Sequence, residues 1–290
     1  MTAKSLLIGG AAVALSLVGV IQAPERAAAS PFLGTAESFA VLGASTVSNT
    51  TATTINGDVG VVNPGTISGT GTITLIAPST YQIDTAAAGL AQADASTAFG
   101  ILAALPFTTN LTGQDLGSVG VLTPGVYFFS SSAQLTGTLT LNFAGASNEE
   151  FVFQIGSTLT TASASDVIVE NGNSTDSVYF EVGSSATLGT NTVFAGNILA
   201  EDSITLDTSA EILCGRAIAL TAAITMEDNT ISNDCTAYNA GSGRSDFGST
   251  GFSGVSSTTT TPVPEPSTLM GFGTALFALI GIGWRRSRLV

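Results

Sequence analysis

Histidine is absent from this chain of 290 residues, and only 7 Lys and Arg residues stand against 21 Asp and Glu residues. Without histidine the chain cannot build a Ser-His-Asp triad, a Cys-His dyad or a metal site with imidazole ligands. The formal net charge of −14 argues against nucleic-acid binding, which requires a basic patch. We therefore expect no nucleic-acid partner and none of these catalytic or metal sites.

Charge of either sign is also scarce. Charged residues make up 10% of the chain, whereas an ordinary soluble domain has about 25%. The chain contains 33 glycines and is rich in Thr, Ser and Ala. This composition favours an all-β protein with many turns, or a chain of low complexity.

The first 29 residues are predicted to be a secretory signal peptide. Lys4 provides a positive start, an apolar run covers residues 6–21, and Ala27, Ala28 and Ala29 form a small-residue cleavage site. The alternative is a membrane anchor, which is less favoured because the apolar run is short for a span.

Residues 263–290 form a second segment with the composition of a sorting signal. Val263-Pro264-Glu265-Pro266 precedes an apolar stretch over residues 268–284, which the basic residues Arg285, Arg286 and Arg288 follow. The stretch is near the lower limit for a transmembrane segment. This order resembles the PEP-CTERM sorting signal of Gram-negative bacteria.

The PEP-CTERM resemblance implies transient anchoring in the inner membrane, removal of the signal by an exosortase-type protease, and delivery to the cell surface or extracellular matrix. The alternative is a plain C-terminal anchor. In either case, membrane contact is expected only through the two sorting segments.

The chain between these segments is strongly acidic, with 19 acidic residues against Arg216 and Arg244, a net charge of −17. Residues 236–262 contain Gly, Ser and Thr runs with few large apolar residues and are predicted to be a linker. The folded domain is therefore expected over residues 30–235, which is long enough for one sizeable core.

Cys214 and Cys235 are the two cysteines of the chain. In an oxidising compartment such a pair is expected to form one disulfide. Closing this loop would stabilise the domain by about 3 kcal/mol in the chain-entropy model. The alternative is two buried free thiols.

The second half of the domain repeats. Apolar runs open at residues 151, 178, 197 and 216, at spacings of 27, 19 and 19 residues. Each is followed by a threonine next to an apolar residue: Thr158, Thr187, Thr205 and Thr225. A third short apolar run closes most units. Three short strands per repeat predict a mainly β fold, a β-solenoid of roughly triangular section. Alternation predicts that Phe151, Phe153 and Ile155 share one face.

Residues 84–105 depart from this pattern. They are rich in alanine, and apolar residues recur there at intervals of three to four positions: Ala87, Leu90, Ala91, Ala95, Ala98, Ile101, Leu102 and Leu105. One long amphipathic helix is expected, with Asp84 as its N-cap and Pro106 beyond its end. The helix must pack alongside the solenoid to bury its apolar stripe.

Seven short segments, taken in order, resemble the microbial ice-binding protein family. They are residues 33–36 (LGTA), 39–42 (FAVL), 56–60 (NGDVG), 122–127 (LTPGVY), 151–159 (FVFQIGSTL), 196–200 (GNILA) and 215–219 (GRAIA). The resemblance implies a discontinuous β-solenoid in which the first strands pack beside the last coils, with one long helix alongside. It also implies adsorption to ice, so that ice and its ordered water are the expected partner.

A flat array of threonines offers a physical basis for such binding, because each carries a rigid β-branched side chain with one hydroxyl and one methyl. The resemblance implies a Thr–Ala/Gly–any–Thr/Asn pattern on the ice-binding face. It selects the candidates Thr51, Thr53, Thr54, Thr190, Thr192, Thr208, Ala210 and Thr221, the later coils only in part. The alternative is that these threonines merely favour β-structure.

Other functions remain as alternatives. The runner-up is a structural or adhesive β-solenoid of the cell surface or matrix without ice activity. The acidic pairs Glu149-Glu150, Glu201-Asp202 and Glu227-Asp228 could suggest a Ca²⁺ site or a glycosidase, but solvated corners are favoured because the acids are scattered. We therefore expect no enzyme activity, no catalytic residues, no cofactor and no metal.

Overall fold

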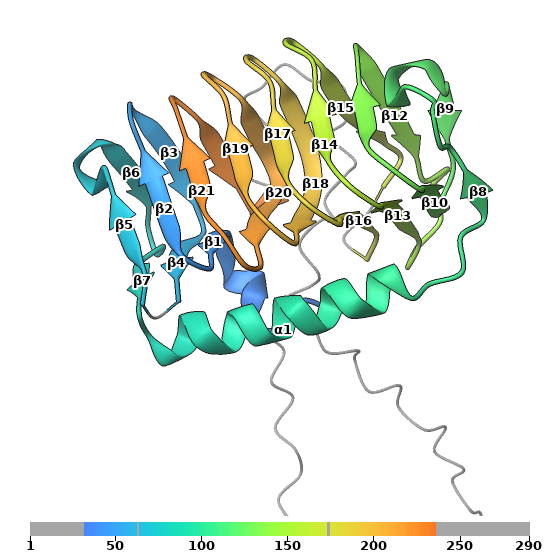
Figure 1. The fold of residues 1–290 in the computed structure, drawn as a ribbon. Coiled ribbons are helices and arrows are strands. Elements are labelled where there is room, and N and C mark those ends of the chain that lie inside the picture. Colours follow the sequence, from blue (N-terminus) through green and yellow to red (C-terminus); the bar gives the residue numbers. More distant parts are fainter. Residues whose placement is uncertain (1–31, 63, 173–174, 236–290) are drawn as a thin grey trace, which may run out of the picture.

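The computed structural model describes residues 32–62, 64–172 and 175–235. They form a β-solenoid of parallel strands with one long helix beside it (Figure 1). One sheet of 15 strands and a second sheet of 7 strands enclose the core. Because the larger sheet bends along β18 (Val193–Ala200) and β20 (Glu211–Ala219), the solenoid has the predicted triangular section, whose sides we call faces a, b and c.

The strands divide among the faces according to their pairing. Face a contains the second halves of β18 and β20 together with β8 (Thr109–Asn110), β10 (Gly125–Phe129), β13 (Glu150–Ile155), β16 (Ser177–Val182), β1 (Phe39–Gly43), β4 (Asp58–Val61) and β7 (Tyr81–Ile83). Face b is the smaller sheet, made of β11 (Ala133–Leu135), β14 (Leu159–Thr161), β17 (Ala186–Leu188), β19 (Ile204–Leu206), β21 (Ile224–Met226), β2 (Thr46–Asn49) and β5 (Thr66–Ser68).

Face c contains the first halves of β18 and β20 together with β9 (Val121–Leu122), β12 (Thr138–Asn142), β15 (Asp166–Glu170), β22 (Thr230–Ser232), β3 (Thr53–Asn56) and β6 (Ile73–Ile76). In Figure 1 the strands of face b lie in front of those of face c. Each complete coil crosses face a, then b, then c. The coil of β16, β17 and the start of β18 is an example.

The solenoid is discontinuous, as the resemblance implied. The chain first builds β1 to β7, passes along the molecule in the helix, and returns from the opposite end through β8 to β22. The last coil then packs on the first one: Val41 pairs with Ala217, Val47 with Ile224, and Ile55 with Ile231.

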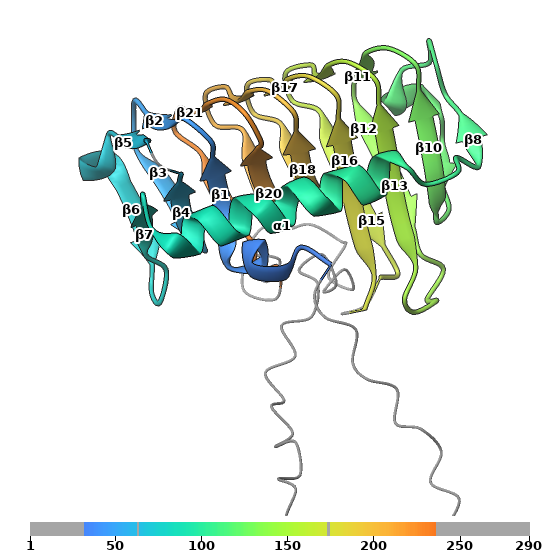
Figure 2. The ribbon, with the colours of Figure 1, turned by 60° about the horizontal axis from the view of Figure 1, so that its bottom comes forward.

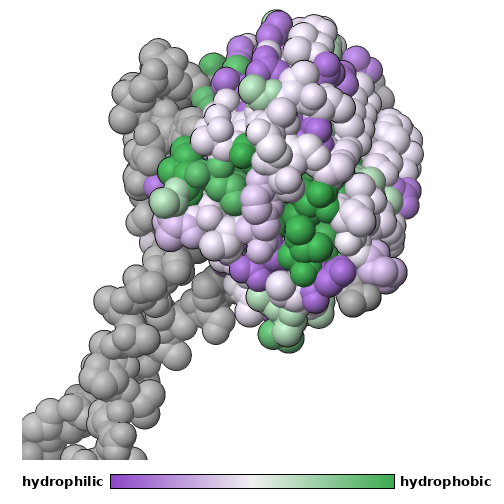
Figure 3. Space-filling model, turned by 90° about the vertical axis from the view of Figure 1, so that its left-hand side faces the viewer, coloured by the Kyte–Doolittle hydropathy of each residue, from purple (hydrophilic) through white to green (hydrophobic). Residues whose placement is uncertain are grey.

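Stacked apolar side chains fill the interior. Phe151, Phe153 and Ile155 are all buried, and the rings of Phe153 and Phe180 stack 4.6 Å apart on neighbouring coils. The predicted alternation is therefore confirmed. At the end formed by β5, β6 and β7, Ile83 is 42% exposed, and Figure 3 shows apolar patches between polar side chains at this end.

The helix α1 (Ala86–Ala103) lies across face a (Figure 2). The sequence prediction was wrong about its cap, because Thr85 accepts the capping hydrogen bond from Ala88 N–H, at 3.1 Å. Asp84 instead has a left-handed backbone (φ 54°) and accepts a hydrogen bond from Gly65 N–H, at 2.9 Å.

The buried stripe of α1 is narrower than the expected one. Ala91, Ala95, Ala98 and Leu102 are buried as predicted, together with Ala88. Leu90 and Ile101, also expected in the stripe, are 59% and 48% exposed. Polar bonds fix this docking, because Gln154 Nε2 donates to the carbonyls of Leu102 and Leu105, at 2.7 and 2.8 Å. Because alanine extends the apolar residues around much of this helix, the periodicity predicts a wider stripe than the one that is buried.

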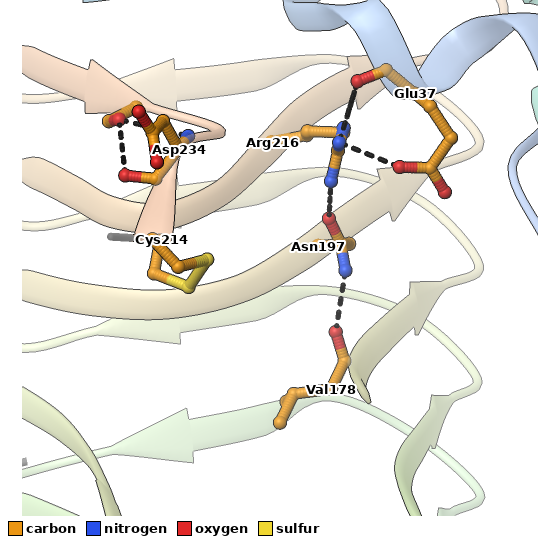
Figure 4. The surroundings of a disulfide bond; sticks show 8 residues. Glu37, Val178, Asn197, Cys214, Arg216 and Asp234 are labelled. Atoms are coloured by element: carbon orange, nitrogen blue, oxygen red, sulfur yellow. Dashed lines mark hydrogen bonds and ion pairs between the residues drawn. A yellow bond between two sulfur atoms is a disulfide. The ribbon is translucent and has the colours of Figure 1, made fainter. Parts of the chain in front are cut away.

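A network of buried side chains closes the seam between the first and last coils (Figure 4). Arg216, which is 1% exposed, donates to the Glu37 carboxylate and to its carbonyl, at 2.7 and 2.6 Å, and to Asn197 Oδ1 at 2.8 Å. Asn197 in turn donates to the Val178 carbonyl at 3.1 Å. Cys214 and Cys235 form the expected disulfide next to this network.

Within the described residues, no helix combines the length and the apolar character that a membrane crossing requires. The predicted signal peptide (1–29), the linker (236–262) and the PEP-CTERM segment (263–290) lie outside the described residues.

Candidate functional site

Face b presents a straight column of small polar side chains. Residues at the centre of each strand lie directly opposite one another on neighbouring coils, with their side chains outward. In order along the sheet they are Gln134, Thr160, Thr187, Thr205, Thr225, Ser48 and Ser68, which we call the central column. Parallel strands are about 4.8 Å apart, so the hydroxyls repeat at this interval along the solenoid.

The flanking residues make this surface regular. Each central threonine stands between two inward side chains; Thr205, for example, lies between the buried Ile204 and Leu206. A second outward column precedes it by two positions: Ser132, Thr158, Ser185, Ser203, Ala223, Thr46 and Thr66. The two columns are about 6.5 Å apart, because a strand rises roughly 3.3 Å per residue. Neither column contains a charged residue.

Side-chain hydrogen bonds hold neighbouring coils in register on face b. Thr158 Oγ1 donates to Ser132 Oγ at 2.8 Å, and Ser48 Oγ donates to Thr225 Oγ1 at 3.4 Å. Carboxylates flank this face at its two corners: Asp207 and Glu227 follow the strands at the corner with face c, and Glu201 and Asp202 precede β19 at the corner with face a. The result is an uncharged, two-dimensional array of hydroxyls and methyls.

Face c has the same architecture but different chemistry. Its outward residues lie opposite one another in the order Thr138, Asp166, Val193, Glu211, Thr230, Thr54 and Thr74. Asp166 and Glu211 therefore interrupt this row with carboxylates, and Glu170 lies beside it on β15.

Face a is not available as a flat surface because α1 covers it. Glu181 lies on the covered side of β16 and is 7% exposed. Burial, with a further contribution from the Glu201 carboxylate, raises the pKa of Glu181 to about 7. On the same side, two hydrogen bonds from Thr35 hold the pKa of Asp94 in α1 below its usual value.

The eight sequence candidates do not form this surface. Thr53 and Thr54 belong to β3 on face c, and Thr221 lies at the corner between faces a and b. The other five lie at the corner between faces b and c. Thr53, Thr192 and Ala210 need correction as ice contacts: they are buried, with 2%, 0% and 0% exposure, so their side chains do not reach the surface.

Both of these buried threonines belong to an internal row of polar side chains. This row, the corner ladder, consists of Thr161, Thr192, Asn229, Thr53 and Asn49. The hydroxyls of Thr161 and Thr192 lie 2.7 Å apart, and Thr161 Oγ1 accepts from Gly189 N–H at 2.8 Å. Asn229 Nδ2 donates to the carbonyls of Asp207 and Ala210, at 3.0 and 2.9 Å. The ladder joins successive coils along one edge of face b.

A signal for the central column was nevertheless present in the sequence. Thr187, Thr205 and Thr225 recur at intervals of 18 and 20 residues, each between two apolar residues. That context is typical of an outward position in a short strand. The pattern taken from the resemblance selected corner residues instead.

In the described part of the chain, no group of three or more His, Cys, Asp or Glu side chains is arranged to hold a metal ion. Asp58, the first residue of β4, has a structural role, since its Oδ1 accepts hydrogen bonds from the backbone and side chain of Thr80, at 2.7 and 2.9 Å.

Comparison with known proteins identifies the family. The model of a family described as ice-binding-like matches residues 41–232. The chain belongs to the ice-binding-like family. A second model, for the PEP-CTERM protein-sorting motif, matches residues 262–287.

Members of the ice-binding-like family resemble this chain over most of its length. An ice-binding protein of Nostoc sp. (strain HG1) is 50% identical over 226 residues, which cover 77% of this chain and 82% of the relative. Ice-binding protein 1 of Shewanella frigidimarina is 28% identical over 267 residues. In that case the match covers 79% of this chain but only 30% of the relative.

Solved structures agree with this assignment. An ice-binding protein from an Antarctic biological consortium superposes with a TM-score of 0.64 at 39% identity, covering 72% of this chain and 93% of that protein. The ice-binding protein of the Antarctic ascomycete Antarctomyces psychrotrophicus gives a TM-score of 0.65 at 36% identity, covering 70% and 98%.

Proposed function

We propose that this protein is exported and adsorbs to ice through face b, without catalysing a reaction and without a cofactor. The observation that carries the proposal is the uncharged central column, in which Thr160, Thr187, Thr205 and Thr225 stand opposite one another on consecutive coils. The names of the relatives support ice as the ligand.

The chemistry of the column fits a crystalline ligand. Ice offers hydrogen-bonding groups at fixed intervals, and a parallel β-solenoid offers hydroxyls at fixed intervals of about 4.8 Å. The β-branched threonine side chain has few rotamers, so little conformational entropy is lost when it contacts a surface. Its methyl group adds apolar burial while its hydroxyl donates to or accepts from water.

The other two faces fit this role less well. Asp166 and Glu211 would hold their own hydration shells on face c, and removing water from a carboxylate is costly. On face a, the exposed side of α1 is a curved helical surface rather than a lattice. Face b is therefore the proposed contact with ice and its ordered water.

The PEP-CTERM match supports export and sorting to the cell surface. We further propose that the signal is recognised by an exosortase-type protease after transient anchoring in the inner membrane of a Gram-negative-type bacterium. The cell surface or extracellular matrix is then the place of action.

The test is ice-affinity partitioning of residues 30–262. We expect the protein to be enriched in a slowly growing ice hemisphere, and the double variant Thr187→Tyr, Thr205→Tyr to be excluded from it. Thr138→Tyr on face c is the matched control and should leave partitioning unchanged. Exclusion of the folded parent protein from ice would contradict the proposal and would favour an adhesive role with a glycan or cellular ligand instead.

A further inference from the structure

Both ends of the solenoid lie on the corner opposite face b. The 3₁₀-helix η1 (Gly34–Ser38) precedes β1, the first strand on face a, and β22, the last strand, lies on face c. The chain therefore enters and leaves at the corner between faces c and a, which is the one corner that face b does not share (Figures 1 and 2).

This exit point is held in place by several bonds. Asn233, which follows β22, donates from Nδ2 to the carbonyls of Glu37 and Ser38, at 3.2 and 3.1 Å. The disulfide attaches Cys235 to Cys214 of β20. The buried ion pair of Arg216 with Glu37 fixes η1 to the same strand, at 2.7 Å (Figure 4). A pull on residue 235 is therefore transmitted to the middle coils of the solenoid.

The sorting motif begins 27 positions beyond Cys235, at residue 262. Covalent geometry allows this segment to reach at most about 100 Å, at no more than roughly 3.6 Å per residue. If the domain is attached through this segment, its corner between faces c and a is the side nearest to the point of attachment. Face b, on the opposite side, then points away from it.

We infer that the protein acts as an adhesin that fastens cells to ice: it stays attached at the cell surface through its C-terminal side while face b binds the crystal. This inference rests on the proposed function of face b. Ends located at a corner of face b would instead hold that face against the cell. The observed placement lets attachment and ice binding occur together.

The test uses the full chain in cells of the source organism. Cells are brought to an ice surface, rinsed, and the retained fraction is counted for four strains: the parent, Thr187→Tyr with Thr205→Tyr, Thr138→Tyr, and a chain that stops after residue 261. Immunoblots of cells and medium locate the protein. Ice partitioning of whatever protein is in the medium is measured in parallel.

We expect the parent and Thr138→Tyr strains to be retained on ice at least tenfold better than the other two. The truncated chain should appear in the medium and still enter ice. The inference is overturned if the parent strain is not retained on ice although its protein partitions into ice. This holds whether the protein is found on the cells or in the medium. If the protein enters ice in no form, the proposed function itself has failed.

Discussion

Faces b and c are built from the same coils, and their inward side chains are alike. On face b, Ile204 and Ile224 fill the core, and on face c, Ile212 and Ile231 do so. The difference lies in the outward residues. The central column of face b has only Thr, Ser and Gln, whereas the matching row on face c includes Asp166 and Glu211. The stacking of coils therefore supplies the lattice on both faces, and the outward residues determine which face can meet ice.

Adding a carboxylate to the central column of face b should have the largest effect on ice affinity. We expect Thr205→Glu to lower ice affinity at least about tenfold, which requires a loss of only ~1.4 kcal/mol of contact free energy. Affinity should partly return below the carboxyl pKa of about 4.3. The matched variant Val193→Glu adds the same charge to face c and should bind ice normally. Equal losses in ice-affinity partitioning for both variants would erase the distinction between the faces.

The shared corner should matter for stability as well as for binding. Thr192→Val removes the hydroxyl that pairs with the buried Thr161 hydroxyl, and we expect a loss of about 1–3 kcal/mol in the free energy of unfolding. Because the ladder also holds the loop after Thr187 through Gly189, ice affinity should fall too. Denaturant unfolding and ice partitioning measure the two effects.

Thr190→Val is the control for the corner, since this side chain lies at the surface of the same loop. Its effect on stability should stay within about 0.5 kcal/mol. A Thr192→Val protein with unchanged stability would show that the ladder does not support the corner.

Face a should respond to pH while face b does not. Because burial raises the pKa of Glu181 to about 7, well above the usual value for a glutamate, the folded state binds the proton more tightly than the unfolded state. Stability is then highest below the unfolded pKa and falls as the pH rises toward 7. Glu181→Gln should be more stable than the parent by about 2 kcal/mol above this range, because solvent screening reduces the full effect of the pKa shift, and no more stable in acid.

Thermal or denaturant unfolding across this pH range checks the expectation for Glu181. Ice partitioning of Glu181→Gln should equal that of the parent throughout, because the residue lies under α1 and away from face b. A parallel change in both properties would show that the helix-covered face controls ice binding.

The smallest effect is expected from removing a single hydroxyl. Thr225→Val keeps the shape of the side chain and should lower ice affinity about threefold, because one net hydrogen bond contributes roughly 0.5–1.5 kcal/mol. Thr74→Val, at an equally exposed position on face c, should change nothing. An unaffected Thr225→Val protein would mean that the methyl groups alone carry the contact.

Much of the fold could be predicted from the sequence because short-range patterns of apolar residues determine which side chains a strand buries. The alternation through Phe151 and Phe153 fixed the inward side, the repeated units indicated the coils, and the oxidising compartment favoured the disulfide. The buried side of α1 followed only in part. Ala95 and Leu102 lie in the predicted stripe, but Leu90 and Ile101 are exposed because apolar residues extend around much of that helix. Among the described residues, the relation of the first coil to the last was available only through the family resemblance.

The candidate site was harder to predict because threonine serves two purposes in this molecule. On a strand, as at Thr205, its hydroxyl faces the solvent. At a corner, as at Thr192, the same hydroxyl satisfies neighbouring polar groups inside the protein. Composition and local pattern are similar in both places, so only the register of each strand separates the two uses.

The seam between the first and last coils also governs how the domain is completed after synthesis. Strands β1, β2 and β3 each have one neighbour from the first coils and one from the last coil, which lies more than 170 residues later in the chain. Because the N-terminal part of the chain is synthesised first, one edge of each of these strands stays unpaired until β20, β21 and β22 have been made. A chain cut short before residue 211 would expose three unpaired strand edges, which are sites of aggregation. The domain can therefore complete its fold only after its last coil, β20 to β22, has been synthesised and translocated.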